Sequence, residues 1–387
     1  MDYLGLVIKA FSSLSGYISI GILLVSYFVL NYMYESLILS LLAFVLPFLV
    51  LTWGCVLLVL SLFQFKSSSK ELRVSKLLLL TVYTMLSFSL WPPFWLFRSS
   101  PSMEQIRNQS KHQSPISVMT WNLQRLGDLE RTAPLRQKAR TKRLACIRES
   151  LESIEQDLEQ KISIYAFQEV SNKNLKALEK EFDINCQHIV YRSIKYAKSG
   201  LGLCVYKGSD WHLNYVRKIK LKGKGSWRAL FGEIGHKKHT NTTFNLLNVH
   251  FRPHHINEDV LKNAIFSLNH ILEIAREVIA NSVTQRQQAK SLLSVIKTYR
   301  DPTLLMGDFN APPRAGTHPL LEESWEDVWR KVGQSFGATK YFGKLLPYRI
   351  DFIYALKNKF ALFSAQVAPV DCSDHRPLIT RIALSKE

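Results

Sequence analysis

The chain has 387 residues, with 50 Lys and Arg against 31 Asp and Glu, a formal net charge of +19. This length suits one large domain with an appendage. The five cysteines form no C-x-x-C pair, which argues against a zinc knuckle or a thioredoxin-type motif. The composition changes along the chain, because residues 1–97 are dominated by Leu, Val, Ile, Phe, Ser and Tyr. The remainder is typical of a soluble α/β protein.

Three apolar stretches occupy the first part of the chain, at about residues 13–33, 37–63 and 77–96. Each is close to or above the roughly 20 residues that a membrane-spanning helix needs. A cleaved signal peptide would have one apolar core of only about 7–15 residues. A buried helical hairpin in a soluble protein is the alternative, and three long uncharged runs disfavour it. We predict a three-helix transmembrane anchor over residues 1–97.

Basic residues in the short loops predict the orientation of this anchor. The loop at residues 64–76 carries four Lys and Arg, whereas the connection at 34–36 carries none and contains Glu35. The loop at residues 64–76 and the N-terminus are therefore expected in the cytoplasm, and residues 98–387 outside it. Three basic residues after the third stretch, Arg98, Arg107 and Lys111, argue the other way. Residues 98–115 are interpreted as a tether.

From residue 116 to 387 predicted strands and helices alternate. Expected strands are 116–122, 162–169, 200–206, 229–234, 243–250, 303–308, 350–355 and 377–383. Expected helices are 136–159, 172–182 and two helices within 258–299, separated near Asn281 and Ser282. Pairs of strands with helices between them predict an α/β fold, a two-sheet β-sandwich flanked by helices.

The charge and the cysteines of this region set limits on its partners. Residues 101–387 carry 44 basic and 28 acidic residues, a net +16. Such a surface suits nucleic acid, anionic lipid head groups or phosphorylated metabolites, or it is simply a solvated surface beside an acidic membrane. We interpret Cys146, Cys186, Cys204 and Cys372 as small buried hydrophobic residues. Disulfides among them would require an extracytoplasmic domain.

Acidic and amide side chains stand where predicted strands end. Glu169 ends an apolar strand, where a carboxylate is costly unless it meets water or a cation such as Mg²⁺. Asn122 ends another strand, and its amide can face a metal or a phosphate oxygen, or occupy a simple turn. Asp308 and Asn310 flank Phe309 and so point to one side of an extended chain. One of them can polarise a water molecule while the other orients it; the alternative is an Asx-turn.

A second group of candidates includes two histidines. His250 ends the strand 243–250, and His375 lies in the string Ser373-Asp374-His375. A carboxylate on one imidazole nitrogen fixes the tautomer and orientation of a histidine. Asp351 and Asp374 are the acids available for such contacts.

Five strings in this order resemble the endonuclease/exonuclease/phosphatase superfamily, which is DNase I-like, over roughly residues 115–385. They are Thr120-Trp121-Asn122, Phe167-Gln168-Glu169-Val170, Gly307-Asp308-Phe309-Asn310, Arg349-Ile350-Asp351-Phe352 and Ser373-Asp374-His375-Arg376-Pro377. The resemblance implies a metal site, Mg²⁺ or Mn²⁺, at Asn122, Glu169 and Asp374. It implies catalytic roles for His250, Asp308, Asn310, Asp351 and His375, with Asp351 orienting His375. It implies phosphate contacts by Asn122, Asn310, His250 and His375.

This resemblance leads us to expect a metal-dependent phosphoester hydrolase tethered to the membrane. Its substrate would be a phosphodiester, with nuclease-like activity, or alternatively a lipid head group or polyprenyl pyrophosphate. An inactive membrane scaffold is the third possibility, disfavoured because every acidic and histidine position is present. The sequence contains no G-x-x-x-x-G-K-[ST] loop, G-x-S-x-G elbow or H-E-x-x-H helix. Segments 207–228 and 252–260 are expected to form loops that determine specificity.

Overall fold

The computed structural model describes residues 115–385, apart from 128–131, 195–196, 224–226, 255–267, 298, 300, 314, 334–336 and 343–345. The three predicted membrane helices, and the predicted tether up to residue 114, lie outside these residues. Within the described ranges, no helix combines the length and the apolar character that crossing a bilayer requires.

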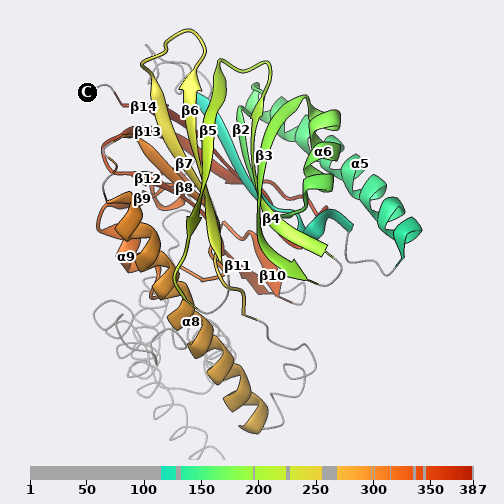
Figure 1. Cartoon of the computed structure of the whole chain (residues 1–387), viewed down its shortest axis with the longest axis vertical. Coiled ribbons are helices and arrows are strands. Elements are labelled where there is room, and N and C mark those ends of the chain that lie inside the picture. The colour runs from blue at the N-terminus through green and yellow to red at the C-terminus, as the bar shows by residue number, and fades with distance from the viewer. Residues whose placement is uncertain are drawn as a thin grey trace, which may run out of the picture.

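Two six-stranded sheets stack to form a sandwich (Figure 1). The first sheet has the order β13-β14-β1-β2-β4-β3 and the second the order β5-β6-β7-β8-β12-β9. The first sheet consists of β1 (Ile116–Asn122), β2 (Ile164–Val170), β3 (Ile184–Ile194), β4 (Ala197–Tyr206), β13 (Phe360–Val367) and β14 (Leu378–Leu384). The second consists of β5 (Trp211–Lys220), β6 (Arg228–His236), β7 (Thr243–His250), β8 (Thr303–Asp308), β9 (Trp325–Asp327) and β12 (Asp351–Leu356). A separate ribbon pairs β10 (Lys340–Phe342) with β11 (Leu346–Tyr348).

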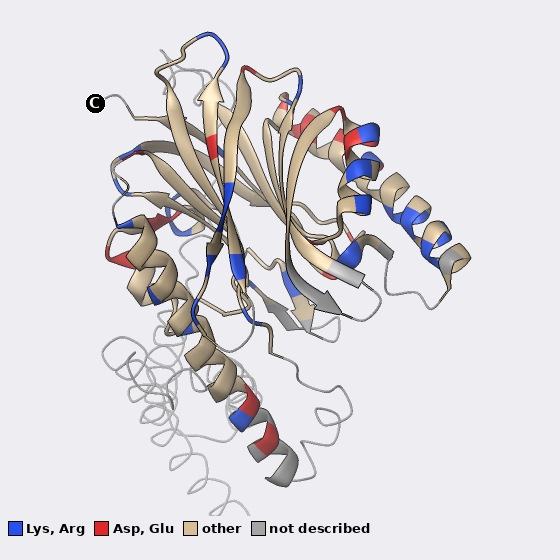
Figure 2. Cartoon of the chain, in the orientation of Figure 1, with Lys and Arg blue, Asp and Glu red and all other residues tan. Residues whose placement is uncertain are grey.

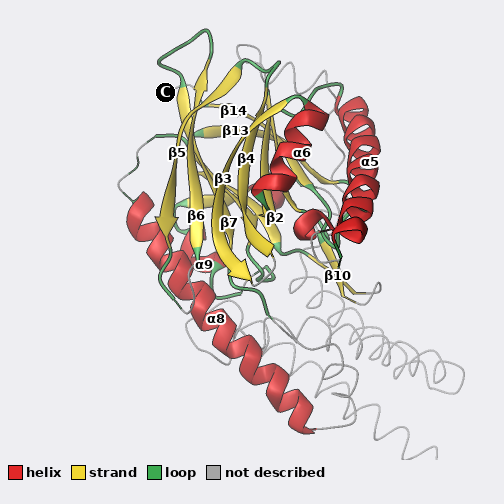
Figure 3. Cartoon of the chain, turned by 45° about the vertical axis from the view of Figure 1, so that its right-hand side comes forward, coloured by secondary structure: helices red, strands yellow, loops and turns green. Residues whose placement is uncertain are grey.

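Helices cover the sheets, as Figure 3 shows for α5 and α6 beside the first sheet. Because strand side chains alternate between faces, Met119 and Trp121 of β1 join the core beneath α5, whereas Val118 joins the core between the sheets. On the other side, α8 contributes Ala289 and Leu292 to the core that includes the second sheet. The helices are η2 (Gln124–Gly127), α5 (Ala133–Leu158), α6 (Asn172–Phe182), α8 (Leu268–Ile296), α9 (His318–Glu322) and α10 (Val328–Val332).

A buried amide pair connects the two sheets below the strand ends. Gln168 of β2 donates its Nε2 to Asn248 Oδ1 of β7 at 2.8 Å and to Thr120 Oγ1 at 2.9 Å. Asn248 donates its Nδ2 back to the carbonyl oxygens of Phe167 and Gly202, at 3.0 and 2.8 Å. Buried polar groups of this kind are stable only when paired, so they fix how one sheet sits on the other. The end of β2 is thereby held against the end of β7.

The predicted α/β sandwich is confirmed, and the predicted strands and the first two helices lie within three residues of their observed ends. The predicted break near Asn281 is wrong, since α8 continues through it. Asn281 remains helical because its side chain is engaged, accepting from Arg252 Nε and donating to Glu277. The predicted loop at 207–228 is also wrong in part, because β5 occupies residues 211–220 as an edge strand.

The cysteine interpretation needs a correction. Cys204 is buried in a core strand as expected, but the four domain cysteines form two disulfides, Cys146–Cys372 and Cys186–Cys204. Cys186 and Cys204 are directly opposite each other on β3 and β4. The sequence separation of 226 residues between Cys146 and Cys372 hides the other pairing until α5 packs beside the C-terminal loop.

Candidate active site

The first element of the site is a buried carboxylate–imidazole pair. Asp351 Oδ2 lies 2.8 Å from His375 Nδ1, and both side chains are almost fully buried. Burial lowers the pKa of His375, but the carboxylates of Asp351 and Asp308 outweigh it, and the pKa is raised to about 9. Burial also raises the pKa of Asp351, with His375 acting in the opposite direction. This is the pairing that the resemblance implied for these two residues.

Lys340, which no sequence pattern indicated, lies on the other side of the imidazole. Its Nζ is 2.9 Å from His375 Nε2 and 3.0 Å from Asp374 Oδ2. Burial acts against the ammonium form, yet the negative charge of Asp374 and its neighbours raises the pKa of Lys340. Burial raises the pKa of Asp374. The positive charges of His375 and Lys340 lower it by more, so the net shift of the pKa is downward.

Asp351 and Lys340, the two partners of His375, favour different protonation states of its Nε2 atom. The raised pKa favours an imidazolium, whereas an ammonium can donate only to a nitrogen that has a lone pair. We assign the Lys340 contact to the neutral imidazole, whose proton is on Nδ1 towards Asp351. In the protonated form, the positive charge of the imidazolium faces the Asp308 carboxylate, whose Oδ2 lies 3.7 Å from Nε2. Lys340 then retains Asp374 as its partner.

Asp308 lies at the centre of the site, at the end of β8. Its Oδ2 accepts from Asn122 Nδ2 at 2.9 Å and lies 3.5 Å from His250 Nε2. Asp308 is directly opposite Asp351 in the β8–β12 register and beside His250 in the parallel β7–β8 register. Backbone pairing therefore brings three predicted residues together without help from the loops.

The turn after β8 places Asn310 differently from Asp308. Asn310 has a positive φ of 49°, its backbone N–H donates to Asp308 Oδ1 at 2.8 Å, and its Nδ2 donates to the Phe251 carbonyl at 3.0 Å. The site thus contains the Asx-type contact considered above, and the Asn310 amide is half-buried. Gly307 precedes this turn with a φ of 143°, and a Cβ there would lie 2.0 Å from the Val249 carbonyl oxygen. Glycine is therefore required where β7 and β8 approach each other.

Glu169 is aimed by a β-bulge. The β2–β4 register shifts between Gln168 and Val170, and Glu169 has a φ of 54°. A non-glycine residue in this region is strained, and bulges commonly re-aim a side chain beside a functional site. The Glu169 carboxylate accepts from Asn122 Nδ2 at 3.3 Å and lies 4.0 Å from His250 Nε2.

A strained turn follows Asn122 and brings a second cation that the sequence did not indicate. Three consecutive non-glycine residues, 124–126, have φ values of 44°, 59° and 45°. Arg143 of α5 donates to the Gln124 carbonyl at 3.0 Å, and Asn174 of α6 donates to the Arg125 carbonyl at 2.9 Å. These contacts hold the turn so that Arg125 Nε lies 3.6 Å from Glu169 Oε2.

The donor set fits a hard divalent cation. Glu169 and Asp308 both accept from the NH₂ group of Asn122, which brings the two carboxylates close to each other. Two neighbouring carboxylates repel each other, and a cation between them relieves that repulsion. The Asn122 oxygen accepts from Gln124 N at 3.0 Å and retains a second lone pair. Asp308, Asp351 and His375 also offer ligand atoms within 4.8 Å of one another.

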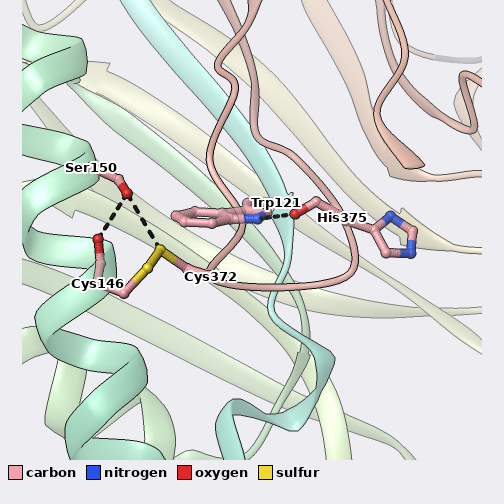
Figure 4. Close-up of a disulfide and its surroundings, with 5 residues drawn as sticks. All are labelled: Trp121, Cys146, Ser150, Cys372 and His375. Atoms are coloured by element: carbon pink, nitrogen blue, oxygen red, sulfur yellow. Dashed lines mark hydrogen bonds between the residues drawn. A yellow bond between two sulfur atoms is a disulfide. The ribbon is translucent and has the colours of Figure 1, made fainter. Parts of the chain in front are cut away.

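A disulfide holds the loop that carries Asp374 and His375. Cys372 bonds to Cys146 of α5, and Ser150 Oγ lies 2.7 Å from the Cys146 carbonyl oxygen and 3.3 Å from Cys372 Sγ (Figure 4). Further along the same loop, Trp121 Nε1 donates to the His375 carbonyl at 2.9 Å. The backbone of His375 is therefore fixed from β1 and from α5.

Exposed basic side chains approach the site along β5. Arg217, Lys218, Lys220 and Lys222 form this basic strip, and all four are exposed. Figure 2 shows Lys and Arg positions along β5. Lys220 pairs with Arg228 at the start of β6, and Trp227 just before it packs edge-on against His250, with ring centroids 5.8 Å apart. The strip thus leads to one rim of the site.

Arg349, part of the string around Asp351, has a structural role. Its guanidinium donates to both carboxylate oxygens of Asp327, at 2.9 and 2.6 Å, and both side chains are buried. Its guanidinium carbon also lies 4.2 Å from the centroid of the Phe352 ring. Arg349 therefore anchors the start of β12 to β9 and α10, which supports Asp351 from behind.

The chain matches the sequence profile of the Endonuclease/Exonuclease/phosphatase family over residues 119–375, a range that contains all the predicted site residues. The chain belongs to this family. Several solved structures share its fold, and no curated protein sequence matches it. Members of the family hydrolyse phosphoester bonds, typically with divalent metal ions.

Three solved structures illustrate the likeness. An endonuclease/exonuclease/phosphatase family protein from Bacteroides thetaiotaomicron is 15% identical with a TM-score of 0.53, covering 71% of this chain and 100% of its own. The corresponding protein from Bacteroides vulgatus is 15% identical with a TM-score of 0.52, over 70% and 100%. The catalytic domain of human Nocturnin, solved with bound sulfate, is 16% identical with a TM-score of 0.50, over 70% and 95%. At these identities the likeness concerns the fold.

The structure brings all the predicted site residues to one end of the sandwich, in one chain of contacts. Asn122 and Glu169 lie on one side of Asp308, and His375 and Asp351 on the other. Asp374 is connected to His375 through Lys340. The roles of these residues in catalysis and in metal or phosphate binding stay predictions. Arg125, Lys340 and the Gln168–Asn248 pair were missed, because isolated basic and amide residues have no distinctive spacing.

Proposed function

We propose that this chain is a metal-dependent phosphodiesterase with nuclease-like activity, tethered to a membrane. The observation that carries the hydrolase proposal is the single contact network joining Asn122, Glu169, Asp308 and His375. Such a network combines a carboxylate that can take a proton with a histidine that can stabilise phosphate. Preorganised charges and donors of this kind are the usual source of phosphoryl-transfer catalysis.

In the proposed reaction, Asp308 orients a water molecule and accepts its proton as the water oxygen attacks phosphorus. Asn122 holds the Asp308 carboxylate in place, and the His250 imidazole lies beside it. His375, held by Asp351, donates Nε2–H to a phosphate oxygen or to the departing ester oxygen as the P–O bond breaks. Asn310, in the turn after β8, would contact the phosphate.

A divalent cation, Mg²⁺ or Mn²⁺, would be held by Glu169 with Asn122, and Asp374 is a further candidate ligand. When bound, it supplies positive charge that neutralises the phosphate in the transition state. Glu169 is half-buried and reachable from solvent, and the bulge and Arg125 hold it at the site.

The basic strip on β5 supports a polyanionic substrate such as nucleic acid. Three of its four exposed cations lie in the second half of β5 and Lys222 lies just after the strand, where they would attract a phosphate backbone. A membrane lipid head group or polyprenyl pyrophosphate is the second candidate. It is favoured by the three apolar stretches in residues 1–97, since tethering raises the local concentration of a membrane substrate.

A substrate panel decides between these candidates. The full-length chain in detergent micelles would receive plasmid DNA, a chromogenic phosphodiester, phospholipids and a polyprenyl pyrophosphate, each with Mg²⁺ or Mn²⁺. Cleavage of DNA and the chromogenic diester supports the nuclease-like reading, whereas selective release of a lipid head group or phosphate supports the alternative. Hydrolysis of none of them by the wild type would favour an inactive scaffold and overturn the proposal.

We also propose that the catalytic domain faces away from the cytoplasm. The basic loop at residues 64–76 supports this orientation, as do the two disulfides, which persist in oxidising compartments. Alkaline phosphatase fused after Glu387 should be active, and a fluorescent protein that folds only in the cytoplasm should be dark there. The reverse pattern would contradict the orientation and remove the main support for an extracytoplasmic lipid substrate.

A further inference from the structure

Lys340 lies at the site without a role in the proposed reaction. It begins β10 and forms an isolated antiparallel bridge with His375, so its backbone is tied to the catalytic loop. Next to it, the buried Thr339 hydroxyl accepts from the backbone N–H groups of Ile350 and Asp351, and the Thr339 carbonyl accepts from Arg376 N–H. The base of the Lys340 side chain is therefore positioned by both halves of the Asp351–His375 pair.

The ammonium group of Lys340 adjoins the atom that would meet the substrate. Its Nζ is 2.9 Å from His375 Nε2, and the Lys340 side chain is 25% exposed, so it remains in contact with solvent at the site. A phosphate has several oxygens, and an oxygen bound by His375 Nε2 places its neighbours within reach of Nζ. Lysine binds phosphate in this way as a point charge with three donors.

Charge neutralisation points the same way. Asp374 Oδ2 is 3.0 Å from Lys340 Nζ, and Asp374 Oδ1 accepts from Ser373 Oγ at 3.3 Å. Asp308 also contributes to the raised pKa of Lys340. The Lys340 ammonium thus supplies the positive charge beside Asp374 that a metal ion there would otherwise supply.

We propose that Lys340 binds the scissile phosphate together with His375, and that its ammonium is the second positive charge of a site that holds one divalent cation. This inference rests on the proposed phosphoester hydrolysis. It makes Asp374 the partner of Lys340, with Glu169 the carboxylate that binds the metal.

Phosphate binding tests the first half directly. Inorganic phosphate is titrated calorimetrically into the full-length wild type and into Lys340→Met, which keeps an unbranched side chain without charge. Loss of a charge-assisted hydrogen bond should weaken binding about 10- to 100-fold. Lys357→Gln is the matched control, because it removes one charge at the far end of β12, where Nζ contacts the Glu322 and Glu323 carbonyls. Equal affinity in wild type and Lys340→Met would overturn the proposal.

A purely structural role for Lys340 predicts something different. If it only held Asp374, then Asp374→Asn should weaken phosphate binding as much as Lys340→Met does. We expect Asp374→Asn to bind phosphate at least as tightly as the wild type, because it removes a negative charge beside the ligand. Equal weakening in the two variants would overturn the proposal.

Two measurements on the wild type do not depend on a variant folding. Phosphate should protect Lys340, and not Lys357, from acetylation of the native chain, as read by mass spectrometry. Mn²⁺ titration followed by electron paramagnetic resonance should give one ion per chain. Unprotected Lys340, or two Mn²⁺ ions per chain, would contradict the inference. If phosphate protects Lys340 while no phosphoester is cleaved, the proposed hydrolysis fails and the binding assignment stands.

Discussion

At the scale of single residues, the site depends on how His375 is held. Asp351 contacts one ring nitrogen, Lys340 contacts the other, and the main-chain carbonyl of His375 accepts from Trp121. The ring therefore has one orientation, with Nε2 towards Asp308. Removing Asp351 would leave the imidazole without the carboxylate that sets its tautomer.

The first prediction concerns this pair. Because Asp351 acts through His375, the double variant Asp351→Asn/His375→Ala should hydrolyse a chromogenic phosphodiester little more slowly than His375→Ala alone. Residues that act as one unit have strongly non-additive effects on the rate. The double-mutant cycle is measured as kcat/KM with saturating Mg²⁺. Losses that multiply would show that the two residues act independently.

A second histidine lies beneath the site and is expected to make stability pH-dependent. His318 is fully buried, its Nδ1 is 2.7 Å from the Tyr354 hydroxyl, and its Nε2 is 3.1 Å from the Ala311 carbonyl oxygen. It also contacts the rings of Phe309 and Phe352, which flank Asp308, Asn310 and Asp351 in sequence. Burial lowers the pKa of His318 to about 4.

The second prediction follows from this lowered pKa. Above about pH 6.5 His318 is neutral in both states, so its contribution to stability is fully present. As the pH falls towards 4, the unfolded chain takes up a proton that the folded chain does not, and the free energy of unfolding falls. The linkage amounts to about 3 kcal/mol for one buried group. Urea unfolding at pH 7 and pH 4.5 should show a smaller pH effect in His318→Asn than in the wild type and in His212→Asn, an exposed control. An equal pH effect on the free energy of unfolding in His318→Asn and in the wild type would contradict this prediction.

At the scale of elements, the loop that carries Asp374 and His375 is bound to α5 by a disulfide. Cys372 immediately precedes Ser373, Asp374 and His375, so its bond to Cys146 restrains the loop that carries the histidine. The other disulfide, Cys186–Cys204, joins two neighbouring strands that are already paired. The two bonds should therefore differ in their effect on activity.

The third prediction compares the two bonds. Removing Cys146–Cys372 with two alanines should lower the free energy of unfolding by about 5 kcal/mol, and removing Cys186–Cys204 by about 3 kcal/mol, in the chain-entropy account of loop closure. Only the first change should also lower kcat/KM, measured at a temperature where circular dichroism shows both variants folded. Full activity without Cys146–Cys372, or an equal loss in both variants, would show that the bond does not position His375.

Some elements could be predicted from the sequence and others could not. Strands such as 116–122 and 303–308 have apolar runs that end in a polar residue, and the pattern located them. The edge strand β5 was missed because it carries the exposed residues Arg217, Lys218 and Lys220, a charged pattern that is also typical of a loop. The continuity of α8 was missed because Asn281 favours a helix end locally, whereas its contacts with Arg252 and Glu277 arise only in the folded chain.

At the scale of the whole molecule, the site is a property of the sandwich. Asn122 and Glu169 belong to the first sheet, and His250, Asp308 and Asp351 to the second. The Gln168–Asn248 hydrogen bonds lie directly beneath them and bind the sheets together. The sequence indicated most of these candidates because they lie in short strings that resemble those of a known superfamily. It did not indicate Arg125 or Lys340, whose relevance comes from a strained turn and a small ribbon that tertiary contacts hold in place.

The central claim is that hydrolysis of a phosphoester bond depends on a divalent cation at Glu169. Glu169→Gln keeps the shape of the side chain and removes its charge, and Glu323→Gln, at an exposed position, is the control. The measurement is hydrolysis of a chromogenic phosphodiester by the full-length chain with Mg²⁺ and with EDTA. We predict that Glu169→Gln lowers kcat at least about 100-fold, as loss of a major electrostatic contribution does. EDTA should abolish wild-type activity, and Glu323→Gln should match the wild type. Near-normal hydrolysis in EDTA, or by Glu169→Gln, would contradict the account.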